Sequence, residues 1–182
     1  ALGGSLGEWA NRLVKAAREI LCPESVSVLV RDTNDGTYLV MAGDGISAAK
    51  RAFLSVSSDS SLLKRLQSGG ILFKELIEKD PSDDSSSIQQ EMEFLNATVI
   101  VPISYGEQIQ SLLCLGPKIG RDMYNDIDLA GLHGLAKSAE LALNALLSGA
   151  QGARNSAAWA HDLLHPLGPK GTFHAIDEFL SG

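Results

Sequence analysis

Alternating apolar and polar residues near the N-terminus predict a β-hairpin. Residues 25–30 place a valine at every second position, and residues 37–41 return after a turn at 32–36, whose Asp, Asn and Gly residues tolerate a positive φ. Two shorter apolar runs, 54–58 and 71–73, predict further strands. This part of the chain therefore contributes several short strands to the predicted sheet.

A second strand pair follows in the other half of the chain. In residues 97–104, Val99, Val101 and Ile103 recur at every second position, and residues 108–115 are mostly apolar. The three residues 105–107, Tyr-Gly-Glu, form the tight turn between them. Because proline has no N–H to donate to a neighbouring strand, Pro102 predicts an edge position or a bulge.

Helical spacing of apolar residues predicts four helices around these strands. They cover residues 6–21, 60–67, 88–95 and 126–147, of which 88–95 could also be a turn. An acidic first turn favours the start of the last helix. A cluster of Pro, Ser and Asp residues at 80–87 predicts an exposed loop. This order of elements predicts an α+β fold, an antiparallel sheet with flanking helices and a long C-terminal helix.

The last helix carries an apolar seam that continues toward the C-terminus. Its members recur at alternating steps of four and three over about five heptads, which is the a/d pattern of a coiled coil. We interpret the seam as a self-associating surface, although Leu141, Leu147 and Trp159 lie off it. His161 takes an e position and so flanks the seam, held by packing yet open to solvent. The seam consists of Leu132, Ala136, Ala139, Leu143, Leu146, Ala150, Ala153, Ala157, Ala160, Leu164 and Leu167.

His161 has the surroundings of a phosphate-accepting histidine. Such a residue needs a neutral ring nitrogen and a rigid support, and Asp162 could orient the ring or take its proton. The motif His-Asp-Leu-Leu-His-Pro-Leu that begins at His161 resembles the H-box of sensor histidine kinases. The resemblance implies that His161 is the phosphoacceptor, that Asp162 is its acid/base partner and that Pro166 bends the helix. Leu164 and His165 depart from the usual pattern, and the His165 position leaves phosphatase activity open.

Two other interpretations of the same histidines remain open. His161 and His165 are four residues apart, so both could bind one metal ion, as in the zinc-hydrolase motif His-Glu-x-x-His. However, Asp162 is shorter than that Glu, Pro166 follows at once and no third ligand is evident. We therefore predict no metal site. The plainer alternative is a pair of histidines on a solvated helix face.

A second resemblance covers residues 6–147. The sequence Val-Ile-Val-Pro-Ile-x-Tyr-Gly-Glu, then Leu-Leu-Cys-Leu-Gly-Pro-Lys, then Tyr124 and Asp128 before a helix rich in Leu and Ala, is similar to the C-terminal half of a GAF domain. The resemblance implies a GAF-like sensor domain over residues 1–147. It implies that residues 148–182 are a linker and the first helix of a histidine phosphotransfer domain.

The GAF resemblance also implies a ligand pocket between the sheet and residues 47–95, with the ligand unknown. Cyclic-nucleotide GAF domains carry Asn-Lys, then Phe, then Asp-Glu. Lys118, Tyr124 and Asp128 stand at comparable spacing, but the Asn and the Glu are replaced. We therefore favour a structural ion pair between Lys118 and Asp128.

Cys22, Cys114 and His133 are the remaining candidates for binding a cofactor. A covalent tetrapyrrole would need an exposed thiol, and an iron–sulfur cluster would need more thiolates than one chain offers. Cys114 lies in an apolar strand and predicts a buried structural thiol. Haem binding through His133 stays open, although a packed or solvent-facing histidine is the commoner role. The pocket could also be empty, with the domain serving only to dimerise.

Composition narrows the classes of function. The 182 residues carry a net charge of −7 and no basic patch with interleaved aromatic residues, so nucleic-acid binding is not expected. No apolar run approaches about 18 residues, so no membrane span is expected. The two cysteines form neither a disulfide framework nor a metal-binding pattern, which favours a reducing cytoplasm. The chain begins without Met, so we interpret it as a piece of a larger protein that could itself be membrane-bound.

Together these patterns predict the sensing and phosphoacceptor part of a two-component sensor histidine kinase. The ATP γ-phosphoryl group would pass to His161 and then to a response-regulator aspartate. The ATP- and Mg-binding domain is expected outside this chain, which alone should not autophosphorylate. The expected protein partners are a second copy and a response regulator, and the GAF pocket could hold a small molecule.

Gly149 and Gly152, each costing about 1 kcal/mol in a helix, predict a weak joint before His161. The alternative is a ligand-binding or dimerising regulatory module in which His161 is inert.

Overall fold

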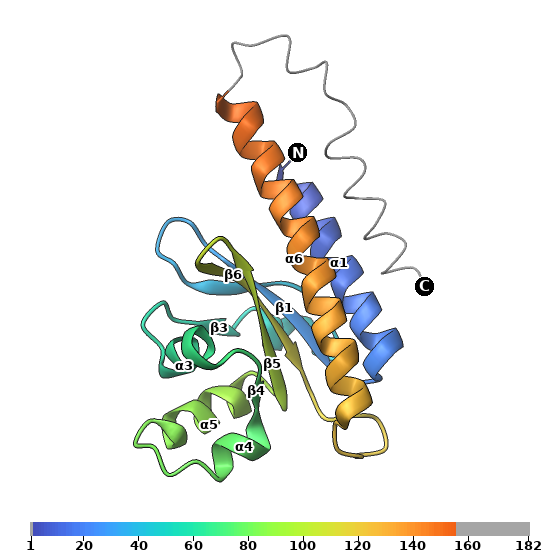
Figure 1. The fold of residues 1–182 in the computed structure, drawn as a ribbon, viewed down its shortest axis with the longest axis vertical. Helices are drawn as coiled ribbons and strands as arrows, with labels where there is room; N and C mark the ends of the chain where they lie inside the picture. The colour runs from blue at the N-terminus through green and yellow to red at the C-terminus, as the bar shows by residue number, and fades with distance from the viewer. Residues whose placement is uncertain (1, 156–182) are drawn as a thin grey trace.

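A six-stranded antiparallel sheet forms the centre of the molecule in a computed structural model that describes residues 2–155 (Figure 1). The strand order is β3-β2-β1-β6-β5-β4, so both predicted hairpins are present and the partners β1 and β6 lie in the middle. Apolar strands that are buried on both faces occupy this central position. The strands are β1 (Val26–Arg31), β2 (Tyr38–Asp44), β3 (Ser55–Val56), β4 (Leu72–Phe73), β5 (Val99–Tyr105) and β6 (Gln108–Leu115).

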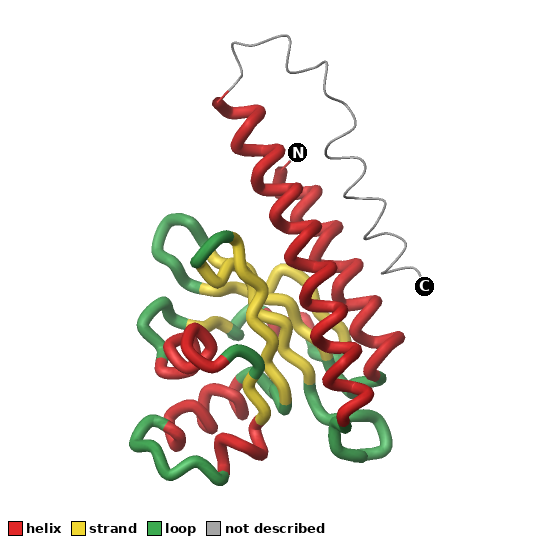
Figure 2. Tube along the Cα trace, in the orientation of Figure 1, coloured by secondary structure: helices red, strands yellow, loops and turns green. Residues whose placement is uncertain are grey.

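Helices cover both faces of this sheet. Two long antiparallel helices, α1 and α6, lie side by side on one face, and α3, α4 and α5 lie on the other (Figures 1 and 2). The sequence did not predict the short helices α2 and α4, and the predicted loop at 80–87 is shorter because α5 begins within it. The helices are α1 (Leu2–Leu21), α2 (Ala48–Arg51), α3 (Ser61–Gly69), α4 (Lys74–Glu78), α5 (Ser85–Phe94) and α6 (Asp126–Asn155).

Each face of the sheet has its own hydrophobic core. The core between the sheet and the two long helices includes Trp9, Leu13, Val28, Val101, Leu113 and Leu143, all buried. The core beneath α3, α4 and α5 includes Leu29, Tyr38, Met92, Ile100, Leu112 and Cys114. Alternate residues of β1 and β6 enter opposite cores, as the two-residue period of a strand requires.

The apolar seam of α6 packs inside this chain. Leu132, Ala139, Leu143 and Leu146 are buried in the core with α1 and the sheet. This corrects the expectation that these positions form a self-associating surface, since a/d spacing also describes a helix that packs on its own domain. A coiled coil further along the chain stays a prediction.

The α6 helix is also longer than predicted. It runs through residue 147 and on to Asn155, so Gly149 and Gly152 lie within regular helix. The two glycines at the predicted weak joint therefore do not interrupt the helix. The cost of glycine in a helix is about 1 kcal/mol relative to alanine, which neighbouring turns can tolerate.

Hydrogen bonds also fix α6 against the rest of the domain. The indole N–H of Trp9 in α1 donates to the carbonyl oxygen of Ala139, with a distance of 3.1 Å from Nε1 to O. Closer to the end of α6, the hydroxyls of Tyr105 and Ser148 lie 3.4 Å apart. Because one contact comes from α1 and the other from the sheet, a rotation of α6 would disturb both.

Within residues 2–155, the outer edge of β5 has no strand partner beyond the short strand β4. That partner pairs only with Val99 and Ile100, so Pro102 stands at an edge, and a bulge follows between Ile103 and Ser104. Both findings confirm the position expected for this proline. The backbone N–H of Ser104 donates to the carboxylate of Glu140 on α6, at 3.1 Å.

Candidate functional site

The face where the GAF resemblance implies a ligand pocket is filled by apolar side chains. Tyr38, Ile100 and Met92 are completely buried between the sheet and the helices α3–α5. Cys114 lies in the same core, as predicted, where burial raises the pKa of its thiol to about 12 despite the opposing effect of the facing Ser27 hydroxyl. This thiol is therefore protonated at neutral pH and poorly suited to covalent attachment.

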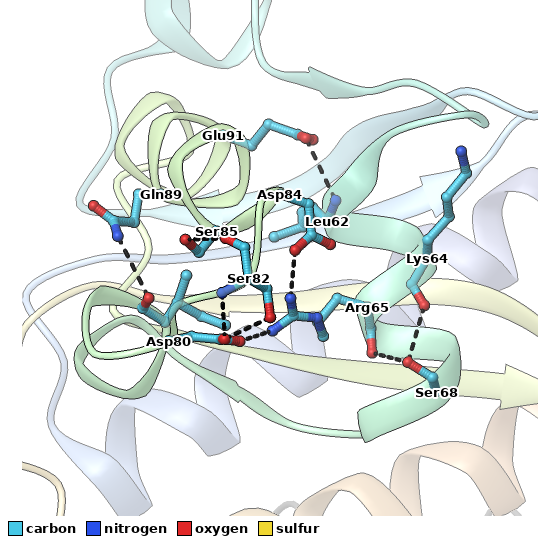
Figure 3. Close-up of polar contacts among 11 residues, drawn as sticks. Leu62, Lys64, Arg65, Ser68, Asp80, Ser82, Asp84, Ser85, Gln89 and Glu91 are labelled. Carbon is cyan, nitrogen blue, oxygen red and sulfur yellow. Dashed lines mark hydrogen bonds and ion pairs between the residues drawn. The ribbon is translucent and has the colours of Figure 1, made fainter.

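An ionic clasp holds the helices on that face. The guanidinium of Arg65 on α3 donates to Asp80 at 2.5 Å and to Asp84 at 2.6 Å, bridging α3 to the segment between α4 and α5 (Figure 3). Hydrogen bonds from Ser82 and from Arg65 lower the pKa of Asp80 to about 2. The carboxylate of Glu91 on α5 also accepts from the backbone N–H of Leu62 at 3.4 Å. These contacts close the face over its core.

A cavity of about 600 Å³ lies elsewhere, between α4 and the loop that joins β6 to α6. We refer to it as the loop cavity. Its apolar wall consists of Phe73, Pro117, Met123 and Tyr124, and Thr98, from the segment just before β5, is a polar lining residue. A volume of this size is typical of small-molecule sites, which combine apolar walls with a few polar groups.

The loop that lines this cavity is attached to the end of α1. The N–H of Glu24 donates to the Pro117 carbonyl at 2.7 Å, and the N–H of Ile119 donates to the Cys22 carbonyl at 2.8 Å. An isolated β-bridge joins Pro23 to Lys118. Cys22 has a φ of 51°, in the left-handed region, which reverses the chain at the end of α1. The segment that follows α1 and the loop that precedes α6 are thus bonded to each other beside the cavity.

Lys118 and Asp128 form the ion pair that the sequence predicted. Their Nζ and Oδ2 atoms are 2.9 Å apart, and both side chains are largely buried. Asp128 also accepts from the Asn125 N–H at 2.8 Å, while Asn125 Oδ1 accepts from the Asp128 N–H at 3.0 Å, which makes a reciprocal cap on α6. Burial alone would raise the pKa of Asp128, but the Asn125 N–H and the Lys118 ammonium outweigh it and lower that pKa. The pair therefore links the cavity wall to the first turn of α6.

Tyr124 links the same loop to the sheet. Its hydroxyl donates to the carbonyl of Gly116 at 2.7 Å, and Lys118 Nζ lies 5.9 Å from the centre of its ring. Burial, together with the nearby negative charge of Asp128, raises the pKa of the Tyr124 phenol, so the hydroxyl remains a donor at neutral pH.

Acidic groups dominate the charged rim of the loop cavity once the internal ion pairs are considered. Lys74 pairs with Glu93 at 3.5 Å, and Lys118 pairs with Asp128 at 2.9 Å. The lining carboxylate of Glu75 pairs with Lys79 at 3.1 Å, so these three lining charges each have a partner outside the lining. Within residues 2–155, we find no ion pair or side-chain hydrogen bond for three lining carboxylates, nor for one lining guanidinium. These groups are Glu24, Glu78, Asp122 and Arg121.

Some of the residues that the sequence suggested for catalysis or cofactor binding lie within the described part of the chain, and others lie outside it. His161, Asp162 and His165 lie outside the described residues, so their roles stay predictions. Cys22 and His133 are both exposed on the surface. Among the described residues there is no group of three His, Cys, Asp or Glu side chains that could hold a metal ion. No helix in this part of the chain is long and apolar enough to cross a membrane.

Sequence reasoning found part of the loop cavity and missed the rest. The motif spacing identified Lys118, Tyr124 and Asp128, which the structure brings together. It did not identify Glu24 or Glu78, because they come from distant segments that only the fold brings to the cavity. No local pattern in the sequence could have linked them.

No family model and no curated protein matches this sequence. Solved structures nevertheless share its fold. The GAF domain/HD domain protein from Geobacter sulfurreducens is 17% identical with a TM-score of 0.59, and the match covers 83% of this chain and 98% of that one. A domain assigned to a two-component sensor histidine kinase of Sinorhizobium meliloti 1021 is 14% identical with a TM-score of 0.52, over 79% and 92% of the two chains.

A third similar structure contains a chromophore. It is the phycoerythrobilin-bound GAF domain of a cyanobacterial phytochrome, which is 14% identical with a TM-score of 0.56, over 79% of this chain and 88% of that one. At these identities the comparison establishes the fold alone. The described part of this chain has the α+β fold of a GAF domain, with a curled antiparallel sheet and flanking helices.

Proposed function

We propose that this chain is a sensory GAF module that reports through α6 to His161, which accepts a phosphoryl group. The shared fold with signalling proteins, among them a sensor histidine kinase domain, supports a role in signal transduction. The phycoerythrobilin in one similar structure supports a small molecule as the kind of input that this fold can receive.

The observation that carries the proposal is the continuity of α6. This helix extends over 30 residues from Asp126 to Asn155, a length of about 45 Å at 1.5 Å per residue. Its first turn is capped at the loop cavity, and its later turns are bonded to Trp9 and to Ser104. A displacement at the cavity would therefore be carried as a rigid-body motion to within six residues of His161.

The proposed chemistry requires two transfers. In the first, a neutral imidazole nitrogen of His161 attacks the γ-phosphorus of ATP, a P–N bond forms, the P–O bond to ADP breaks and ADP leaves. The carboxylate of Asp162 accepts or orients the proton on the other ring nitrogen. In the second, an aspartate carboxylate of a response regulator attacks the phosphorus, and the P–N bond breaks. A second copy of the chain and the response regulator are the proposed protein partners.

The alternative is a GAF regulatory module that binds a ligand or dimerises without phosphotransfer. The same fold and the same α6 contacts would serve it, because they involve only residues 2–155. The two proposals differ in whether His161 becomes phosphorylated.

Trans-phosphorylation separates these two functions. The full chain is mixed with the ATP-binding domain of a histidine kinase, labelled ATP and Mg²⁺, and the product is tested for acid lability. We expect an acid-labile label that His161→Gln abolishes, and that His165→Gln and His133→Gln retain. An Asp162→Asn variant should be labelled more slowly. If the ATP-binding domains of several histidine kinases all give no label, phosphotransfer is rejected and the regulatory module takes its place.

A further inference from the structure

The loop cavity has the charge and shape to recognise a specific class of ligand. We propose that it binds a small organic cation with an apolar body, and that binding is registered at the first turn of α6. This inference deepens the proposed sensory function, on which its biological meaning rests.

The first argument is the contrast between the two candidate pockets. The face beneath α3–α5 is filled by buried side chains such as Tyr38 and Met92 and is closed by the Arg65 clasp. The loop cavity has about 600 Å³ of free volume. Sites of this size bury most of the surface of a small organic molecule. The open cavity, and not the filled face, is therefore the better receptor.

The second argument is the charge that remains after internal pairing. Lys74 and Lys118 are already neutralised by Glu93 and Asp128, which do not line the cavity. Of the four lining carboxylates, Glu75 is paired with Lys79, which lies outside the lining. The other three, on Glu24, Glu78 and Asp122, accompany a single lining guanidinium, so the unpaired groups of the described lining carry a net charge of −2. An electrostatic potential of this sign favours a cation and disfavours an anion.

The apolar wall favours the same class of ligand. Phe73 and Tyr124 are the aromatic residues of the lining, and aromatic faces attract organic cations at distances up to about 6 Å from the ring centre. Lys118, at 5.9 Å from the Tyr124 ring, already illustrates such a contact. An ammonium group could reach the rim carboxylates while its apolar body lies against these rings.

The position of the cavity explains how binding would be registered. Lys118 and Tyr124 line the cavity, and the same residues hold the loop before α6 through Asp128 and Gly116. A ligand that shifts either side chain would therefore directly move the loop that leads into the capped first turn of α6. Trp9 reports on this helix because its indole N–H is bonded to the Ala139 carbonyl.

The first test is a charge series on the full chain. Phenethylamine (a cation at neutral pH), 2-phenylethanol (neutral) and 3-phenylpropionate (an anion) have similar apolar bodies, and their binding is measured by calorimetry and NMR. We expect phenethylamine to bind most tightly and the propionate most weakly. Equal binding of the three, tighter binding of the anion, or no saturable binding of the amine would each overturn the proposal.

Substitutions of the rim then locate the binding site. Because the groups are exposed, Glu78→Gln and Asp122→Asn should each weaken phenethylamine binding by about threefold, and together by about tenfold. Glu107→Gln is the matched control, since it removes one exposed carboxylate in the turn at the far end of β5 and should leave binding unchanged. Unfolding midpoints show that each variant is folded. Unchanged binding in the double variant would place the amine elsewhere and reject the site.

Trp9 fluorescence tests the connection to α6. In a Trp159→Phe background Trp9 is the single tryptophan, and we expect phenethylamine to change its emission with the same dissociation constant as calorimetry gives. Binding without this change would refute the link to α6. Neither measurement involves phosphorylation, so failure here and failure of the phosphotransfer proposal are distinguishable.

Discussion

Replacing Asp128 by asparagine should destabilise the domain far more than removing an exposed carboxylate. The Asp128 side chain is 11% exposed and its partner Lys118 is 18% exposed. The substitution keeps the shape and an oxygen that can accept from Asn125, but it leaves the lysine charge without its counter-ion. A charge left unpaired in such a place is costly because little water reaches it.

The magnitude follows from the burial of the pair. Removing one partner of a fully buried ion pair costs about 3–5 kcal/mol, and the partial access of Lys118 to water reduces this to about 2–3 kcal/mol. The pair between Lys79 and Glu75 has a similar distance, 3.1 Å, but its side chains are 70% and 46% exposed. Glu75→Gln should therefore cost less than about 0.5 kcal/mol.

Urea unfolding at pH 7 measures both variants, followed by circular dichroism and by tryptophan fluorescence. Equal loss of stability in Asp128→Asn and Glu75→Gln would refute the reasoning. The pH dependence gives a second check. Because the folded pKa of Asp128 is lowered, its stabilisation is present above its unfolded pKa of about 3.9 and is lost as the pH falls through the folded value. The difference between wild type and Asp128→Asn should therefore shrink below about pH 4.

Three further changes test local features of the fold. Gly45→Ala should cost about 1–3 kcal/mol and more than Gly70→Ala, because both have a φ of 75° but only at Gly45 would a Cβ meet backbone atoms; urea unfolding compares them. Maleimide should label the exposed Cys22 quickly and the buried Cys114 only after unfolding, which mass spectrometry detects. Arg65→Gln should accelerate limited proteolysis between α4 and α5, and an unchanged cleavage rate would contradict the clasp.

The sequence predicted the sheet well because its strands carry strong local patterns. The valines of β1 and the apolar run of β6 belong to the two central strands, where both faces are buried. The helix α4 was not predicted because its five residues, Lys74–Glu78, are too few to show a helical period. Its position depends on contacts with α5 that no local pattern encodes.

The seam of α6 shows where periodicity is ambiguous. Leu132 and Leu143 satisfy a coiled-coil pattern and equally satisfy packing on α1 and the sheet. Only the fold decides between these environments. The candidate site was likewise predictable only in part. Lys118 and Asp128 are ten residues apart and recognisable as a pair, whereas Glu24 lies far from them in the sequence and is brought to the cavity by the fold.

The contact between Glu140 and Ser104 also occupies a backbone N–H at the open edge of the sheet. An open strand edge offers N–H groups on which another chain can add a strand. At the edge of β5, Pro102 has no N–H to offer, and the N–H of Ser104 is already bonded to Glu140. The helix that is proposed to carry the signal thus also covers this N–H group. We expect a variant with a loosened α6 to expose the edge of β5 to strand addition, in addition to any change in signalling.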